Sequence, residues 1–194
     1  MDFFDFANIP ESSKLRKALE KFEDHHRELL LSSIIEINFQ KGENVFKQSS
    51  PASHVGLIKS GLLKVCVTEK QNRNLILKLA GAGEFIGITS SYGKSTHRYT
   101  SVAVESSELV LIDKVVFQKL LIQYPDFFIE IMNQLSNNEL FILKRLTSLT
   151  QKQIPGRIAH ALLYFSDDIF RSDEFVLPLS RQEFSEFIST SKES

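Results

Sequence analysis

The pattern of apolar and polar positions divides the chain into three parts. Residues 12–31 place apolar side chains near helical spacing after a pair of serines, which predicts one N-terminal helix. Residues 33–113 contain short Val-, Ile- and Leu-rich runs with partial alternation, separated by turn residues. Strands without intervening helices favour a compact antiparallel jelly roll. The runs cover residues 33–39, 43–48, 54–60, 62–68, 74–80 and 107–113.

After residue 113 the spacing becomes helical. Residues 115–124 predict a short amphipathic helix that ends before Pro125, and a much longer helix opens at Asp126. A heptad stripe with one polar member runs along the long helix and comprises Phe128, Met132, Leu135, Glu139, Ile142, Leu146 and Leu149. A second apolar face comprises Phe127, Ile131, Phe141 and Leu143.

Two apolar faces on one helix can serve two partners. The heptad stripe alone would also suit packing on the jelly roll of its own chain. With a second face available for that role, we expect the stripe to pair with an identical helix across a two-fold axis, as a parallel coiled-coil homodimer. Glu139 would then lie at or beside the seam, where it repels its counterpart unless it is paired.

The C-terminal residues carry helix-start signals. Pro155 interrupts the helical pattern, residues 158–170 predict another helix, and residues 175–179 a short extended piece. Residues 180–183 have the Ser-x-x-Glu form of a capping box, and residues 190–193 have the related Thr-x-x-Glu form. Two capped helix starts joined by a tight connection describe a helix-turn-helix whose second helix has just begun. Two ordinary surface helices are the alternative.

The composition is that of an ordinary globular protein, with 194 residues, 42% hydrophobic and 24% charged, and a net charge of −1. This balance gives no general attraction to nucleic acid, so DNA binding requires a local element. The single cysteine, Cys66, excludes an internal disulfide and an iron–sulfur cluster. No apolar run reaches the roughly 20 residues that cross a bilayer, and the N-terminus lacks the basic flank of a signal peptide. We expect a cytoplasmic protein without a membrane partner.

From about Phe22 onward, the chain resembles the cyclic-AMP receptor protein and fumarate–nitrate regulator (CRP/FNR) family, in that family's order of barrel, long helix and helix-turn-helix. Residues 177–194, LPLSRQEFSEFISTSKES, are similar to the helix-turn-helix of that family. Residues 39–88 follow the family's effector domain, with Gly42-Glu43, Ser60-Gly61 and the turn at residues 83–87 in place. The resemblance implies an α+β fold made of an antiparallel β-jelly-roll effector domain, a long dimerisation helix and a partial winged helix-turn-helix domain.

The resemblance also implies a domain order and a function. Residues 1–124 would form the N-terminal helix and the sensor domain, residues 125–150 the dimerisation helix, and residues 151–194 the DNA-binding domain. In this family a small ligand or redox signal reorients helix-turn-helix units in the major groove. The implied partners are DNA, a second copy of the chain and RNA polymerase.

Matching the helix-turn-helix residue by residue assigns DNA contacts. Lys192 stands where relatives usually have Arg, and lysine lacks the rigid fork that reads guanine with two bonds. Ser189 stands where the family often has Gly, which matters if that turn needs a positive φ. The family's phosphate contacts fall on Arg181, Gln182, Ser191 and Ser194, and its base-reading pair falls on Lys192 and Glu193. Because the sequence ends at Ser194, we expect the natural chain to continue and these residues alone to form no specific DNA complex.

The sensor departs from the cyclic-nucleotide pattern. Relatives that bind cyclic nucleotides hold the ribose with a Glu after the Gly of the turn, but here Gly87 is followed by Ile88. The phosphate-binding Arg falls on His97, or on Arg98 after a slip of one residue. An unpaired buried hydroxyl costs about 1–3 kcal/mol, so cyclic AMP is not favoured. The predicted pocket residues are Gly87, Ile88, Thr89, His97, Arg98, Thr100 and Ser101.

The effector is left open as another anion, a small apolar molecule, or none. We expect His97 and Arg98 to be cations at the pocket mouth, with a solvated loop charge as the alternative for Arg98. A genuine cyclic-nucleotide-responsive regulator, and a regulatory module that acts through protein contacts without DNA, are the alternative functions.

Other cofactors and catalysis have little support in the sequence. Haem sensing would need a histidine as an axial ligand, and no histidine of this sequence stands in a context that supports that role. The histidines are His25, His26, His54, His97 and His160. The isolated His54 and His97 do not form the gathered His and carboxylate set of a metal-dependent oxygenase. No nucleophile elbow, phosphate loop or Cys/His pair is present. We therefore predict no catalytic residue, no metal and no certain cofactor.

Overall fold

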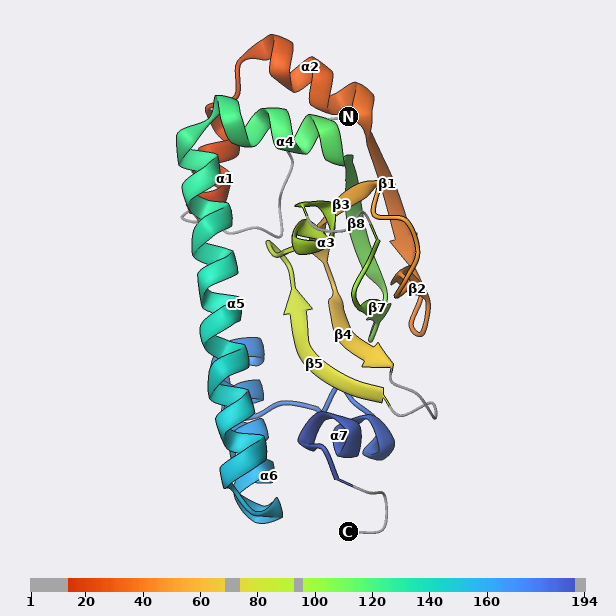
Figure 1. Cartoon of the computed structure of the whole chain (residues 1–194), viewed down its shortest axis with the longest axis vertical. Helices are drawn as coiled ribbons and strands as arrows, with labels where there is room; N and C mark the ends of the chain where they lie inside the picture. Colours follow the sequence, from red (N-terminus) through yellow and green to blue (C-terminus); the bar gives the residue numbers. More distant parts are fainter. Residues whose placement is uncertain (1–13, 69–73, 93–95, 191–194) are drawn as a thin grey trace.

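The computed structural model describes residues 14–68, 74–92 and 96–190 and shows an α+β protein, in which two antiparallel sheets lie beside one long helix (Figure 1). The strands are β1 (Ile34–Phe39), β2 (Asn44–Phe46), β3 (His54–Ser60), β4 (Leu62–Thr68), β5 (Asn74–Gly81), β6 (Phe85–Ile86), β7 (Thr100–Ala103) and β8 (Ser107–Asp113). The helices are α1 (Lys14–Glu20), α2 (Asp24–Ser33), α3 (Ile88–Tyr92), α4 (Lys114–Gln123), α5 (Pro125–Gln151), α6 (Ile154–Tyr164), the π-helix η1 (Phe165–Phe170) and α7 (Arg181–Ile188).

The strands form the predicted antiparallel jelly roll, here called the β-roll. One sheet has the strand order β1-β8-β3-β6 and the other β2-β7-β4-β5. Apolar side chains from both sheets, including Ile58, Leu63 and Leu109, are buried together. The sequence pattern did not predict two of the strands, β6 and β7. β6 has only two residues, and β7 is interrupted by Ser101, which is polar yet fully buried.

The single N-terminal helix expected over residues 12–31 is in fact two helices, α1 and α2. The chain turns between them because Phe22 is drawn into the core, with its ring centroid 4.4 Å from that of Tyr124 and 5.4 Å from that of Phe127. The Arg27 side chain donates hydrogen bonds to the backbone carbonyls of Phe22 and Glu20, which satisfies acceptors freed by the break.

The long helix begins and runs as the sequence predicted, and one of its faces packs on the rest of the chain. Pro125 occupies the first turn, where its missing N–H costs nothing. In Figure 1, α5 runs along the β-roll from α4 to α6. The side chains that meet the same chain follow a heptad repeat of their own, here called the packing face: Phe127, Ile131, Gln134, Asn138, Phe141, Arg145 and Ser148.

The C-terminal helices share a core with the β-roll. The helix expected over residues 158–170 begins at Ile154 and changes to π-helical bonding at Phe165. Residues 175–179 form no strand. Beyond them α7 lies against β5, with Phe187 and Ile188 buried in a cluster that also contains apolar residues of β4 and β5. The first helix of the predicted helix-turn-helix is therefore docked on the β-roll.

Candidate functional site

A cavity of about 350 Å³ lies between the β-roll and the middle of α5. The turn from β6 into α3 forms one wall, β4 and β5 form another, and α5 closes the third. Most of the lining is apolar and includes Val65, Leu77, Ile88, Leu135, Ile142 and Leu143. The polar side chains at its edge are Lys78, Thr89, Tyr99, Asn138 and Glu139.

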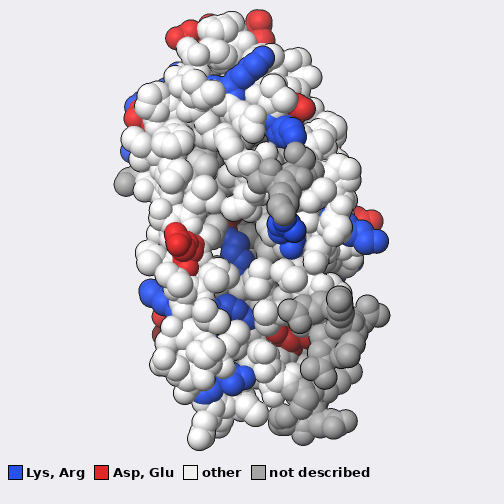
Figure 2. Space-filling view, viewed as in Figure 1, with Lys and Arg blue, Asp and Glu red and all other residues white. Residues whose placement is uncertain are grey.

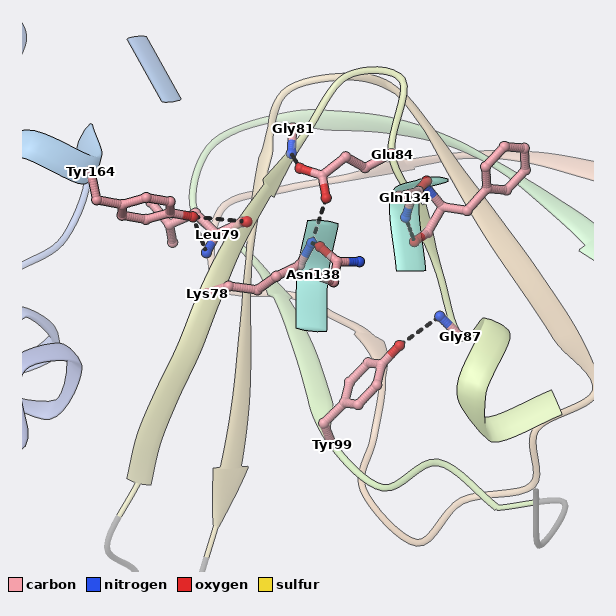
Figure 3. A network of polar contacts seen from close by, with 10 residues as sticks. Lys78, Leu79, Gly81, Glu84, Gly87, Tyr99, Gln134, Asn138 and Tyr164 are labelled. Atoms are coloured by element: carbon pink, nitrogen blue, oxygen red, sulfur yellow. Dashed lines mark hydrogen bonds and ion pairs between the residues drawn. The ribbon is translucent and has the colours of Figure 1, made fainter. Parts of the chain in front are cut away.

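Most of these polar side chains already have partners, as Figure 3 shows. Lys78 pairs with the Glu84 carboxylate and donates to Asn138 Oδ1 at 2.7 Å. Glu84 in turn accepts the backbone N–H of Gly81 at 3.0 Å. One turn earlier on α5, the Gln134 amide exchanges two hydrogen bonds with the backbone of Phe85. This polar network fixes α5 against the turn that forms the cavity wall.

Tyr99 occupies the inner end of the turn. Its hydroxyl accepts the backbone N–H of Gly87 at 2.6 Å and is also bonded to the Thr89 side chain. Burial raises the pKa of Tyr99, and these two hydrogen bonds partly oppose the rise. Gly87 has a φ of +88°, and a Cβ there would lie 3.0 Å from the Phe46 ring and 3.2 Å from the His54 carbonyl oxygen. The position therefore requires glycine.

The predicted pocket residues fall into two groups. Gly87, Ile88 and Thr89 line the cavity. His97 does not stand at the mouth as a cation: its side chain is 2% exposed and stacks on Phe46 with ring centroids 4.2 Å apart. Burial lowers the pKa of His97, which favours the neutral ring. Arg98 is exposed and does not line the cavity.

Thr100 and Ser101 serve the sheet instead of the cavity. The Thr100 hydroxyl accepts the backbone N–H of Gln48, and the Ser101 hydroxyl accepts that of Phe46. Both residues lie on β7, where they tie it to the segment around β2. The sequence pattern could not assign them because their direction depends on strand pairing.

The heptad stripe lies beside the packing face, displaced by one residue along α5. Phe128, Met132, Glu139, Ile142 and Leu146 are exposed, while Leu135 and Leu149 are half-buried. Three residues of the predicted second face, Phe127, Ile131 and Phe141, pack on the same chain, but Leu143 is 53% exposed. The structure thus leaves an apolar row on α5 open to solvent.

The start of α7 carries the capping box that the sequence predicted. The Ser180 hydroxyl accepts the Glu183 N–H at 3.3 Å, and the Glu183 carboxylate accepts the Ser180 N–H at 2.7 Å. Arg181 and Gln182 follow at the exposed start of the helix. Ser189 ends α7 with a φ of +52°, so this turn does use the left-handed conformation that glycine favours. The predicted contacts Ser191, Lys192, Glu193 and Ser194 lie outside the described residues.

Three side chains that the sequence analysis missed hold α6 and α7 on the β-roll. Lys64 of β4 forms an ion pair with the capping residue Glu183. Arg145 of α5 is buried, donates to the carbonyl of Ile76 at 2.7 Å and also donates to the carbonyl of Phe187. Tyr164 of α6 bonds the backbone N–H and carbonyl of Leu79 through its hydroxyl. These partners are far apart in the sequence, so local patterns carry no sign of them.

The described surface offers little to an ion. Glu23, His25 and His26, at the start of α2, place ligand atoms within 4.8 Å of one another. His26 Nδ1 already lies 2.7 Å from the Tyr124 hydroxyl. Basic and acidic side chains are interspersed over the face in Figure 2, in keeping with the near-zero net charge. No helix in the described ranges combines the length and the hydropathy that a membrane span needs.

Comparisons with known proteins agree with this architecture. The family model of the cyclic nucleotide-binding domain matches residues 36–124. The cAMP-activated global transcriptional regulator CRP of Salmonella typhimurium is 22% identical over 151 residues, which cover 76% of this chain and 72% of that protein. Electron transport regulator A of Shewanella oneidensis is 26% identical over 159 residues, covering 80% of this chain and 63% of that protein.

Solved structures share the fold. The c-di-GMP-responsive global regulator CLP of Xanthomonas campestris aligns with a TM-score of 0.75 and 22% identity over 88% of this chain and 87% of CLP. FixK2 of Bradyrhizobium japonicum aligns with a TM-score of 0.73 and 17% identity over 82% of this chain and 79% of FixK2. The domain match assigns residues 36–124 to the cyclic nucleotide-binding domain family, and the curated relatives together with the observed β-roll, long helix and capped α7 make the chain similar in sequence and fold to CRP/FNR transcription regulators.

Proposed function

We propose that the protein is a homodimeric, cytoplasmic DNA-binding regulator, without catalytic activity, in which a small molecule in the β-roll cavity controls the position of the helix-turn-helix. The working parts are the sensor over residues 1–124, the dimerisation helix over 125–150 and the DNA-binding domain from 151. The observation that carries the proposal is the contact of α5 with both the cavity and α7.

The exposed heptad stripe supports the homodimer. A row of apolar side chains on a long helix is unfavourable in water, and pairing with a second α5 would remove it from solvent. Glu139 sits in this row and also lines the cavity. A ligand that changes the surroundings of Glu139 would therefore act at the dimer seam as well as in the sensor.

The docking of α7 supports the control step. α7 is held by Lys64 from the β-roll and by Arg145 from α5, and the same helix α5 closes the cavity. A shift of α5 on ligand binding would change both contacts and turn the two DNA-binding units relative to each other. Two such units reach successive major grooves when they are about 34–36 Å apart. RNA polymerase would be the partner at a promoter.

DNA selection tests the proposal. The protein made from its complete gene is incubated with a library of random duplexes, and the bound fraction is sequenced. We expect a two-fold symmetric consensus. Arg181→Ala should weaken binding about uniformly across sequences and lower the salt slope by about 2, because Arg181 of each of the two protomers is proposed to touch one phosphate. Failure to enrich any sequence, with a folded dimer, would favour a module that acts through protein contacts.

A further inference from the structure

We infer that the cavity between the β-roll and α5 takes an uncharged, mainly hydrocarbon small molecule, and not a nucleotide or another anion. The inference rests on the proposed function, because it names the class of effector for the same cavity. Its volume of about 350 Å³ is within the range of small-molecule sites. Burial of a hydrocarbon ligand against Val65, Leu77 and Ile142 supplies the binding free energy.

The charges around the cavity argue against an anion. Of the described residues that line it, Lys78 is the one basic side chain, and it is already paired with Glu84 and bonded to Asn138. A phosphate would have to displace Glu84, leaving a partly buried carboxylate without its cation. Glu139 adds a second negative group on the α5 side. The nearest basic residue predicted for the pocket, Arg98, lies outside the lining.

The backbone groups that could bind an oxyanion are also occupied. The N–H of Gly87 points to the hydroxyl of Tyr99, as Figure 3 shows, and that hydroxyl is bonded to Thr89 as well. A ligand phosphate at this turn would have to break the 2.6 Å bond and move a largely buried aromatic ring. An apolar ligand needs no such exchange, because it meets side chains that have no bonds to lose.

Two dyes that share the same aromatic rings and differ by one charged sulfonate group test the inference on the intact protein. 1-Anilinonaphthalene is uncharged, and its 8-sulfonate carries one negative charge on the same rings. We expect fluorescence titration to show that the uncharged dye binds at least about tenfold more tightly than the sulfonate. Excess cyclic AMP should leave the bound uncharged dye in place. Equal or tighter binding of the sulfonate, or displacement by cyclic AMP, would overturn the inference.

Variants locate the dye. Val65→Phe fills the cavity, and Leu143→Glu puts a carboxylate at its edge on an exposed position that does not threaten folding. Each variant should bind the uncharged dye about tenfold or more weakly than the unchanged protein does. If Val65→Phe fails to fold in a thermal melt, Leu143→Glu decides alone. The control variant is Ile122→Gln. Ile122 is 85% exposed and lines a separate apolar hollow beside Tyr92 and Phe128.

The outcomes separate the inference from the proposed function. Loss of dye binding in Ile122→Gln, with binding retained in Leu143→Glu, would place the dye in the other hollow and overturn the inference. Specific DNA binding combined with a preference for the sulfonate would overturn the ligand class alone. Preference for the uncharged dye without any selected DNA sequence would support the cavity chemistry and contradict the regulator proposal.

Discussion

Arg145 joins three elements that are far apart in the sequence. From α5, its guanidinium donates hydrogen bonds to the carbonyl of Ile76 in β5 and to the carbonyl of Phe187 near the end of α7. The guanidinium carbon Cζ also lies 3.8 Å from the centroid of the Phe187 ring. The last carbonyls of a helix lack partners within it and attract positive charge. Burial lowers the pKa of Arg145 to about 10, with Tyr164 opposing the change, so the group stays charged at neutral pH.

Replacing this side chain should loosen α7. Arg145→Met keeps the apolar stem but leaves two buried carbonyls without a donor, and we expect a loss of about 2–3 kcal/mol in the free energy of unfolding. Urea unfolding followed by circular dichroism measures it. Lys144→Met, at the exposed neighbouring position, is the matched control and should change stability by less than about 0.5 kcal/mol. Equal effects of the two variants would contradict the assigned role.

The pair Lys64–Glu183 can be isolated by a double-mutant cycle. Glu183→Gln keeps the capping geometry, since glutamine also serves in a capping box, and removes only the charge. Lys64→Met removes the partner. We expect a coupling of about 1 kcal/mol at neutral pH for this partly buried pair. A coupling near zero would mean that the apolar contacts of Phe187 hold α7 without help from charge.

The same pair predicts an acid response. Desolvation raises the pKa of Glu183, but hydrogen bonds from Lys64 and Ser180 outweigh it and bring the pKa to about 2. A folded-state pKa below the unfolded value gives stability that is present above about pH 4.5 and is lost as the pH falls toward 2. Unfolding measured between about pH 5 and pH 3 should therefore show a smaller acid loss in Glu183→Gln than in the unchanged protein. An identical loss in both would contradict the low pKa.

At the scale of elements, the sequence predicted α5, its start and its two faces, because a heptad repeat over 27 residues is a strong periodic signal. It did not reveal that the packing face contains Gln134, Asn138 and Arg145. Polar side chains on a helix usually indicate solvent, and these are satisfied only by groups on distant strands. The split of the N-terminal helix was missed for a related reason, since Phe22 fits both a helical repeat and a buried turn.

The exposed heptad stripe predicts the oligomeric state. Leu146 is 57% exposed on α5 and makes no contribution to the buried clusters, so Leu146→Glu should leave the protomer folded while placing like charges at the seam. Sedimentation should then show dimers of the unchanged protein and monomers of the Leu146→Glu variant. Ile35→Glu introduces the same charge on β1, at a site 49% exposed and away from α5, and should stay dimeric. A dimeric Leu146→Glu variant would contradict the assigned seam.

At the scale of the whole molecule, the turn that forms the cavity wall was predictable and the rest of the pocket was not. Gly87, Ile88 and Thr89 are contiguous, so a local motif places all three. His97 and Arg98 directly precede β7, so their direction is set by how that strand pairs with β2 and β4. Adjacent residues on such a segment point to opposite sides, and His97 went into the core while Arg98 went to solvent.

The buried His97 makes the fold sensitive to mild acid. Its Nδ1 has no hydrogen-bond partner among the described residues, and burial lowers its pKa, so the unfolded chain takes up a proton before the folded one does. Stability should therefore fall as the pH drops below about 6.5. His97→Phe keeps the ring stack on Phe46, and urea unfolding between about pH 7.5 and pH 5.5 should show a flatter response. The pKa of His160 is lowered too, mainly by desolvation, so some slope should remain.

The core shared by the β-roll and the C-terminal helices has a consequence for the order of folding. Leu79 and Tyr164, which bond to each other, are 85 residues apart, and Phe187 completes the same cluster later still. During synthesis, the apolar surface of β4 and β5 emerges from the ribosome well before the helices that cover it. Contacts between such distant segments are also slow to form. We therefore expect the nascent β-roll to pass through a stage in which an apolar patch is uncovered, and to need protection by chaperones until α7 has been synthesised.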